Sequence, residues 1–172
     1  QTAERRLIYR DARVAQPSVS RSYLAAERDA GAQETAAALT VLAEILGGGQ
    51  TSVLSEKLQF ETQTAIYTGA FYSGVSMDDT TFDFVVVPAE GISLEAAEAA
   101  LDKVIAEFLT TGVDGAQLER IKMQIRAADI YARDDVVRAA NRYGRALTTG
   151  LTVADVQAWP EILQAVTADD VM

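Results

Sequence analysis

The fold depends on residues 43–54, which read Ala-Glu-Ile-Leu-Gly-Gly-Gly-Gln-Thr-Ser-Val-Leu. Before the three glycines, apolar residues recur at intervals of three and four, which predicts a helix over residues 32–46. Glycine adopts the left-handed conformation that ends a helix, so this helix is expected to stop at Gly47. A second, short helix is predicted from Ser52 to Gln59. The stretch therefore predicts two helices joined by a tight turn.

Strand patterns lie on both sides of this helix pair. Residues 4–10 and 17–25 predict two strands joined by a polar turn. Residues 65–73 and 81–88 predict a further pair, and the seven residues from Gly74 to Thr80 between them favour an antiparallel hairpin. In the last of these strands, Phe82, Phe84 and Val86 alternate with Asp83, Val85 and Val87, as expected of a strand with one buried face.

The remaining sequence predicts helices, and the order of elements sets the fold class. Ser93 is a helix N-cap, and Gln117 stands in the capping-box position three residues after Asp114. The expected helices run over residues 93–110, 114–132, about 135–147, and from Thr152 to just before Trp159-Pro160. This order predicts an α+β, two-layer sandwich, with helices on one face of a mixed or antiparallel sheet. We expect residues 1–172 to form a single domain, cut from a longer chain and truncated in its last helix.

Composition excludes several kinds of chemistry. The 172 residues include 25 Asp and Glu against 15 Lys and Arg, a formal charge of −10, and neither His nor Cys. Zinc sites, Ser-His-Asp and Cys-His catalysis and disulfides are therefore excluded, leaving only an all-oxygen site for Ca²⁺ or Mg²⁺. The excess of acidic residues disfavours nucleic acid as a partner. No apolar run approaches the roughly 18 residues that a membrane span requires.

Two polar segments resemble ligand sites only superficially. The turn at 47–52 lacks the Gly-Lys-Ser/Thr ending of a phosphate loop and follows a helix rather than a strand, which favours a structural turn. The carboxylates of Asp78, Asp79 and Asp83 lack the alternating spacing and central glycine of a calcium loop. They are interpreted as a solvated hairpin.

Three arginines form a more specific pattern. Arg138, Arg142 and Arg145 are spaced by four and three residues, which places them on one side of a predicted helix. Such a row suits a peptide carboxylate or a phosphate, and a free-standing small-ligand module is one hypothesis. The alternative is intramolecular pairing with the surplus acidic residues.

Several segments together resemble the C-terminal, non-catalytic half-domain of the insulinase/pitrilysin family of zinc metallopeptidases, the inverzincins with a processing-peptidase-like fold. The glycine turn with its flanking helices is similar to a hallmark of that half-domain. Further similar segments follow in the same order along the chain, at residues 78–82, 112–122, 150–156 and 166–171. The resemblance spans essentially the whole sequence.

The resemblance implies a clamshell peptidase in which one half holds zinc on an inverted His-x-x-Glu-His helix. A chain without His is implied to be the other half, which has no catalytic or metal-binding residue of its own and is not an enzyme by itself. It would close over a peptide substrate and position it for hydrolysis at a zinc ion in a catalytic half-domain, supplied in cis or in trans. A bacterial, periplasmic location is also implied.

Two positions bear on substrate contact. Many relatives supply an Arg and, seven residues later, a Tyr near the substrate carbonyl. Here the aligned positions hold Gln59 and Ile66, and Tyr67 lies one residue further on, where a regular strand would turn it to the opposite face. The resemblance leaves Gln59 and Tyr67 as candidate substrate contacts. The missing Arg/Tyr pair keeps open an alternative function, a catalytically inactive scaffold of the same family.

Overall fold

The computed structural model describes residues 3–132 and 134–172, and it confirms the α+β class. Strands and helices follow one another in an order close to that predicted. The elements are β1 (Val19–Ala25), α1 (Glu34–Gly47), the π-helix η1 (Ser55–Glu61), β2 (Ala65–Tyr72), β3 (Thr80–Pro88), α2 (Leu94–Thr111), α3 (Gly115–Ala132), α4 (Val136–Thr148), α5 (Val153–Ala165) and α6 (Ala168–Val171).

The strands form an antiparallel sheet in the order β1-β3-β2. Because paired residues share a face, β3 shows which side of every strand meets the helices. Phe82, Phe84 and Val86 of β3 are buried on the helix face, whereas Asp83 and Val85 lie on the opposite, open face. The name open face is used below for the side of the sheet that carries Asp83 and Val85.

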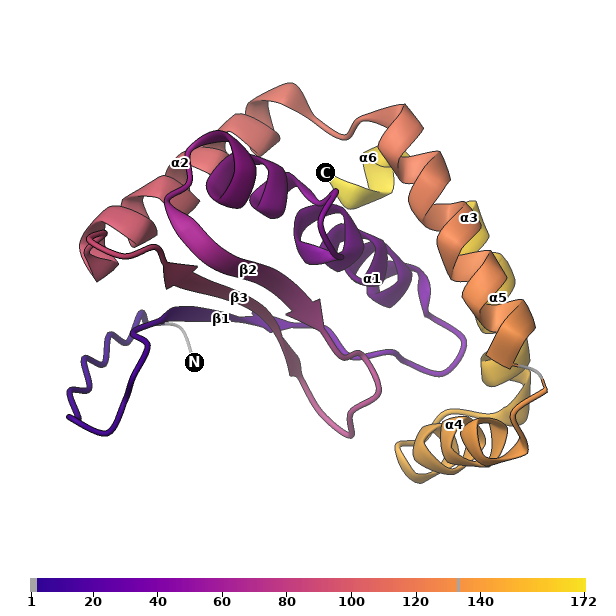
Figure 1. Cartoon of the computed structure of the whole chain (residues 1–172). Coiled ribbons are helices and arrows are strands. Elements are labelled where there is room, and N and C mark those ends of the chain that lie inside the picture. The colour runs from indigo at the N-terminus through magenta and orange to yellow at the C-terminus, as the bar shows by residue number, and fades with distance from the viewer. Residues whose placement is uncertain (1–2, 133) are drawn as a thin grey trace.

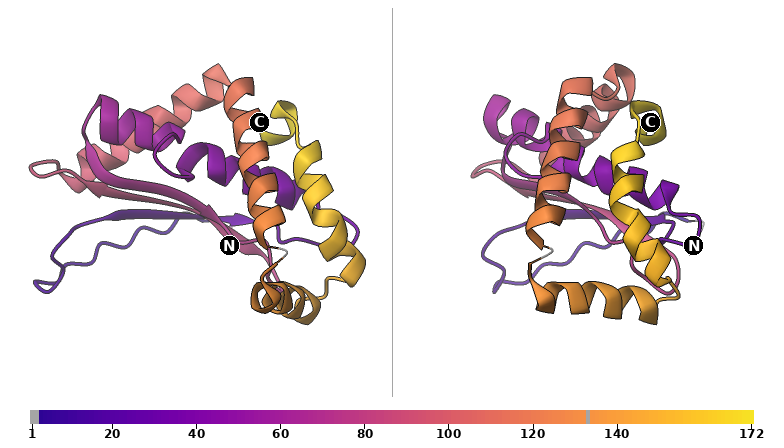
Figure 2. Two further views of the ribbon diagram at one scale, coloured as in Figure 1. Left: turned by 45° about the vertical axis from the view of Figure 1, so that its right-hand side comes forward. Right: turned by 90° about the vertical axis from the view of Figure 1, so that its right-hand side faces the viewer.

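The helices lie on one side of the sheet and at one of its ends. Helices α1 and α2 lie over the helix face, and α3 and α5 run side by side at one end of the molecule (Figure 1). Helix α4 lies across one end of the α3–α5 pair (Figure 2), and among the helices it contacts mainly α5. Within the described residues, no helix combines the length and the apolar character needed to span a membrane.

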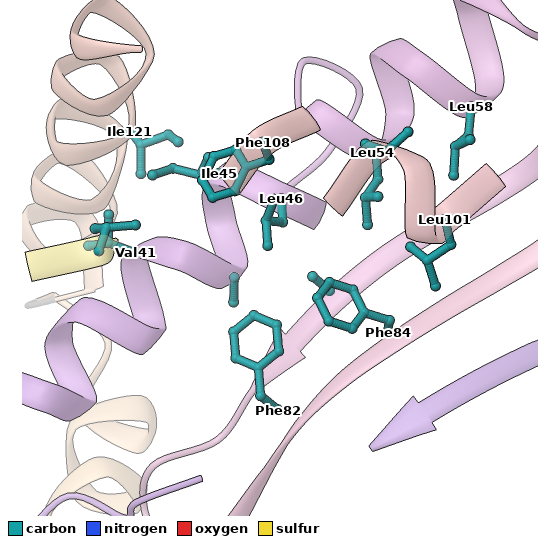
Figure 3. Close-up of a cluster of buried hydrophobic side chains, with 14 of the residues drawn as sticks. Val41, Ile45, Leu46, Leu54, Leu58, Phe82, Phe84, Leu101, Phe108 and Ile121 are labelled. Carbon is teal, nitrogen blue, oxygen red and sulfur yellow. The ribbon is translucent and has the colours of Figure 1, made fainter. Parts of the chain in front are cut away.

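The core forms where the sheet meets the helices. Phe82 and Phe84 point from β3 toward the helix layer, where Leu46, Leu54 and Leu101 are also buried (Figure 3). Burying a side chain of this size stabilises the folded state by about 1.5–3 kcal/mol. The glycine turn is essential to this arrangement. It places Leu46 of α1 and Leu54, the residue before η1, in the same cluster.

Gly47 lets the end of α1 touch strand β2. A Cβ atom added at Gly47 would lie 1.9 Å from the backbone nitrogen of Ala70 and 2.8 Å from its Cβ. No side chain fits in that space, so the helix and strand pack this closely only because residue 47 is glycine. Gln117 of α3 reinforces the turn, since its side-chain amide donates to the carbonyl oxygens of Thr51 at 3.2 Å and Ile45 at 3.4 Å.

That contact corrects the predicted role of Gln117, which was a capping box with Asp114. The Asp114 carboxylate instead accepts a hydrogen bond from the backbone N–H of Ala116, and the Gln117 side chain is buried against the glycine turn. Spacing alone does not distinguish the two roles, because position three of a helix can face either its own N-terminus or a neighbouring element.

Two further predictions are wrong, one of a strand and one of a helix end. No strand forms over residues 4–10, because nothing in the described chain pairs with that segment, and Leu7 stays 89% exposed. Helix α5 does not end before Pro160 but runs through it to Ala165. Proline inside a helix costs about 3 kcal/mol. Burial of Leu163 and packing of Trp159 against Arg28 offset that cost.

Replacing Gly47 with alanine is expected to lower the free energy of unfolding by about 3 kcal/mol or more, because the new methyl group meets backbone rather than a flexible side chain. Urea denaturation measures the loss. Gly115→Ala is the matched control: its Cβ would meet nothing within 4 Å and its φ is not positive, so stability is expected to stay the same or rise slightly. Equal stability of the two variants would contradict the close-packing argument.

Candidate functional site

Three backbone irregularities fall within a short segment at the start of β2. Residues 55–61 form a π-helix, Gln63 has a φ of 51°, and a β-bulge separates Ala65 from Tyr67. Each departs from the regular pattern at some energetic cost, and such features are over-represented at functional sites. Both candidate substrate contacts, Gln59 and Tyr67, lie in this segment.

The side chain of Gln59 is anchored inside the domain. Its amide nitrogen donates to Thr68 Oγ1 at 2.8 Å and to Ser55 Oγ at 3.0 Å, and Ser55 accepts a further bond from Ser52 at 3.0 Å. The three hydroxyl-bearing residues are all buried. Gln59 therefore links η1 to β2. The amide nitrogen of its side chain is bonded, whereas its carboxamide oxygen has no hydrogen-bond partner within the described chain.

Tyr67 lies on the other side of the strand. It pairs with Val87 on the open face, is 47% exposed, and its hydroxyl makes no hydrogen bond within the described part of the chain. The bulge leaves Ile66 outside the ladder and 54% exposed, so Ile66 and Tyr67 are both accessible. A regular strand would have turned one of them inward.

Gln59 and Tyr67 are near each other in the sequence, but their side chains lie on different sides of β2. The Gln59 amide reaches Thr68 on the helix face, whereas Tyr67 stands on the open face with Phe71, which is 46% exposed. Sequence reasoning missed Ser55 and Thr68, which hold Gln59. Isolated hydroxyl residues in a sequence give no signal that they will share one buried hydrogen-bond network.

The arginine row of α4 pairs largely with acidic residues. Arg142 donates to Asp129 of α3 at 2.9 Å, and Arg138 lies 3.7 Å from Asp135, one turn away on the same helix. These pairs agree with the intramolecular alternative. Exposed pairs of this kind contribute little stability, about 0–1 kcal/mol.

The described residues do not gather into a metal centre. The sequence has no His or Cys, and across residues 3–132 and 134–172 no three acidic side chains gather where they would hold a cation. The hairpin carboxylates are used otherwise, since Asp83 accepts hydrogen bonds from Ser22 and Thr81, and Asp78 accepts the backbone N–H of Asp79. The described residues therefore offer no grouped set of ligands for a zinc ion.

The family is settled by sequence. The pattern described as the peptidase M16 inactive domain matches residues 1–125, which is most of the chain. The chain belongs to the M16 inactive-domain family. That assignment agrees with the resemblance drawn from the glycine turn, and it makes this part of the protein the non-catalytic peptidase domain.

Solved structures similar to this M16 inactive domain support the fold. A protease from Helicobacter pylori matches with a TM-score of 0.82 and 20% identity, over 95% of this chain and 38% of that one. A candidate zinc protease from Bordetella pertussis Tohama I matches with a TM-score of 0.76 and 18% identity, over 91% of this chain and 84% of that one. The periplasmic protease PqqL from Escherichia coli matches with a TM-score of 0.64 and 16% identity, over 90% of this chain and 17% of that one.

These likenesses show the fold alone, because each identity is below 25%. The domain spans well under half of the Helicobacter pylori protease. A comparison with curated protein sequences finds no match.

Replacing Gln59 with leucine is expected to lower the free energy of unfolding by about 1–2 kcal/mol, because the hydroxyl groups of Ser55 and Thr68 lose their amide donor while staying buried. Urea denaturation measures the change. Gln124→Leu is the control, since Gln124 is exposed and makes no hydrogen bond in the described chain. Indistinguishable midpoints for the two variants would show that the Gln59 network does not stabilise the fold.

Proposed function

We propose that this domain closes over a peptide substrate and positions it for hydrolysis at a zinc ion held by another domain. The observation that carries the proposal is the match to the M16 inactive domain over residues 1–125. The absence of any zinc-ligand set in the described residues supports it, because the hydrolytic centre then has to lie elsewhere. The partner is a zinc-bearing half-domain, in cis or in trans, of a zinc metalloendopeptidase.

The proposed substrate contacts are Tyr67 and Gln59. The free hydroxyl of Tyr67 donates a hydrogen bond to a peptide carbonyl, and the unpartnered carboxamide oxygen of Gln59 accepts one from a peptide N–H. Because the two side chains lie on opposite faces of β2, which is an edge strand, they contact different parts of a peptide backbone that runs along that edge. Anchoring of the Gln59 amide by Ser55 and Thr68 supports this role, because a fixed side chain loses little entropy on binding.

A second candidate function is a catalytically inactive scaffold of the same family. One observation favours it: Gln59 and Ile66 occupy the positions where many relatives carry Arg and Tyr. A scaffold needs the fold and its surfaces but no substrate-orienting donors.

A periplasmic location in a bacterium is part of the proposal. It draws on the periplasmic protease PqqL, whose fold this domain shares. Fractionation of cells that express the complete protein from its own gene tests the location.

Mixing the domain with its zinc-bearing half tests the main proposal. Cleavage of a quenched fluorescent peptide is expected to rise at least tenfold over the zinc half alone, and to disappear when a chelator removes zinc. No gain in cleavage, despite complex formation by size-exclusion chromatography, would reject substrate positioning and favour the scaffold.

Tyr67→Phe is expected to lower kcat/KM in that mixture by about 2–10-fold, because one hydrogen bond to the substrate contributes about 0.5–1.5 kcal/mol. The melting temperature is expected to stay unchanged, since the hydroxyl makes no bond within the described chain. The control is Tyr131→Phe, which removes a hydroxyl from an 81% exposed tyrosine of α3. Equal kinetics for both variants would exclude Tyr67 as a contact.

A further inference from the structure

Arg28 is a buried cation in the loop between β1 and α1, with only 7% of its surface exposed. Its Nε donates to Gln33 Oε1 at 2.5 Å, and its Nη2 donates to the backbone oxygen of Asp155 at 2.8 Å. The guanidinium carbon lies 3.9 Å from the ring centre of Trp159. These contacts fix the orientation of the guanidinium between the β1–α1 loop and helix α5.

Among the residues that the structure describes, no carboxylate binds this guanidinium directly. The nearby Asp155 carboxylate is engaged by other donors, the backbone N–H of Gly31 at 2.9 Å and the N–H and hydroxyl of Thr152 at 2.8 and 2.6 Å. Burial lowers the pKa of Arg28 to about 10, so the group remains protonated at pH 7. The Asp155 carboxylate partly opposes this pKa shift electrostatically, without a direct ion pair to Arg28 in the described chain.

One nitrogen of Arg28 remains available. Nη1 makes no hydrogen bond in the described chain, and every fully buried side-chain nitrogen or oxygen there has a partner. Nη1 is therefore not fully buried, and Arg28 lines a pocket of about 400 Å³. The same pocket is lined by Ser76 of the β2–β3 loop and by Thr149 and Gly150 after α4.

The charges around the pocket restrict what it can hold. Glu27 and Asp29 line it beside Arg28, so a multiply charged anion such as phosphate is repelled. Arg142 also acts electrostatically on Arg28, but its guanidinium is bound to Asp129. A ligand with one carboxylate for Nη1 and one cation for Glu27 and Asp29 matches the pocket.

We propose that this pocket binds the C-terminal carboxylate of a peptide whose last residue is basic, with the carboxylate on Arg28 Nη1 and the basic side chain between Glu27 and Asp29. The peptidic nature of the ligand rests on the proposed function, whereas the carboxylate site rests on the Arg28 geometry. This site holds the C-terminal end of the peptide, and Tyr67 is not among the residues that line it.

Trp159 provides the measurement, because it is the only tryptophan of the chain and stacks on Arg28. The 172-residue chain is titrated with the peptide acetyl-Ala-Ala-Lys as the free acid, and binding is followed by tryptophan fluorescence and by calorimetry. The acid is expected to bind about tenfold or more tightly than the C-terminal amide, since the neutral amide offers the Arg28 cation no negative charge to pair with. Acetyl-Ala-Ala-Ala acid is expected to bind more weakly than the lysine peptide, and inorganic phosphate not at all.

Three variants assign the site. Arg28→Gln removes the cation, and Arg126→Gln is the matched control, because Arg126 is an exposed arginine outside this pocket with no hydrogen bond in the described chain. Ser76→Glu keeps Arg28 but places a carboxylate in the pocket. Arg28→Gln and Ser76→Glu are both expected to lose binding at least tenfold, and Arg126→Gln to keep it. If Arg28→Gln does not fold, Ser76→Glu decides.

Equal calorimetric affinities for acid and amide, or unchanged binding by Ser76→Glu, would overturn the site. Stronger binding of phosphate than of the peptide acid would overturn the peptide as its ligand. These titrations need no zinc-bearing half. An unchanged cleavage rate in the mixing experiment together with a positive titration would reject substrate positioning and leave the carboxylate site standing.

Discussion

The contact between Gly47 and Ala70 sets the geometry of the whole domain. The end of α1 reaches the backbone of β2 with no side chain between them, and this fixes both the height of the helix above the sheet and the direction in which the chain leaves it. That direction matters because Leu54, which directly precedes η1, and Leu58 within η1 both have to reach the core. Gln117 then joins α3 to the same turn through two carbonyl oxygens.

Strand β2 separates the part of the site that stabilises the fold from the part that faces outward. On the helix face, Thr68 receives the Gln59 amide, and Ala70 meets Gly47. On the open face, Tyr67 and Phe71 are about half exposed. The π-helix and the bulge make both arrangements possible at once, since they shift Gln59 and Tyr67 out of the positions that a regular helix and strand would give them.

The sequence predicts the regular elements well and the irregular ones poorly. Helices α1 and α2 and strands β2 and β3 follow clear apolar periodicity, because each buries one face against the others. The strand expected at residues 4–10 fails because strand formation needs a partner, which local pattern cannot supply. The helix end predicted before Pro160 is wrong because tertiary packing of Trp159 and Leu163 outweighs the local tendency of proline to end a helix.

The candidate site was predictable only in part. A resemblance to a known family pointed to Gln59 and Tyr67, yet no pattern shows that a bulge exposes Ile66 and Tyr67 together. Arg28 gave no signal at all, because it is a charged residue in a loop whose burial depends on Trp159 and Asp155, more than 120 residues away in the sequence.

Strand β1 differs from its neighbours, because none of its residues is fully buried. Backbone bonds to β3 and the ion pairs of Arg21 with Glu98 and Asp102 of α2 hold it in place. In the described chain, β1 contributes only the half-buried Ala25 to the packing against the core cluster, and its Tyr23 ring lies edge-on to Phe84. Its amide protons should therefore exchange with deuterated solvent well before those of β2 and β3, through a local opening rather than global unfolding. An equivalent strand from another polypeptide could take the vacated edge, which makes β1 the natural place for strand exchange between molecules.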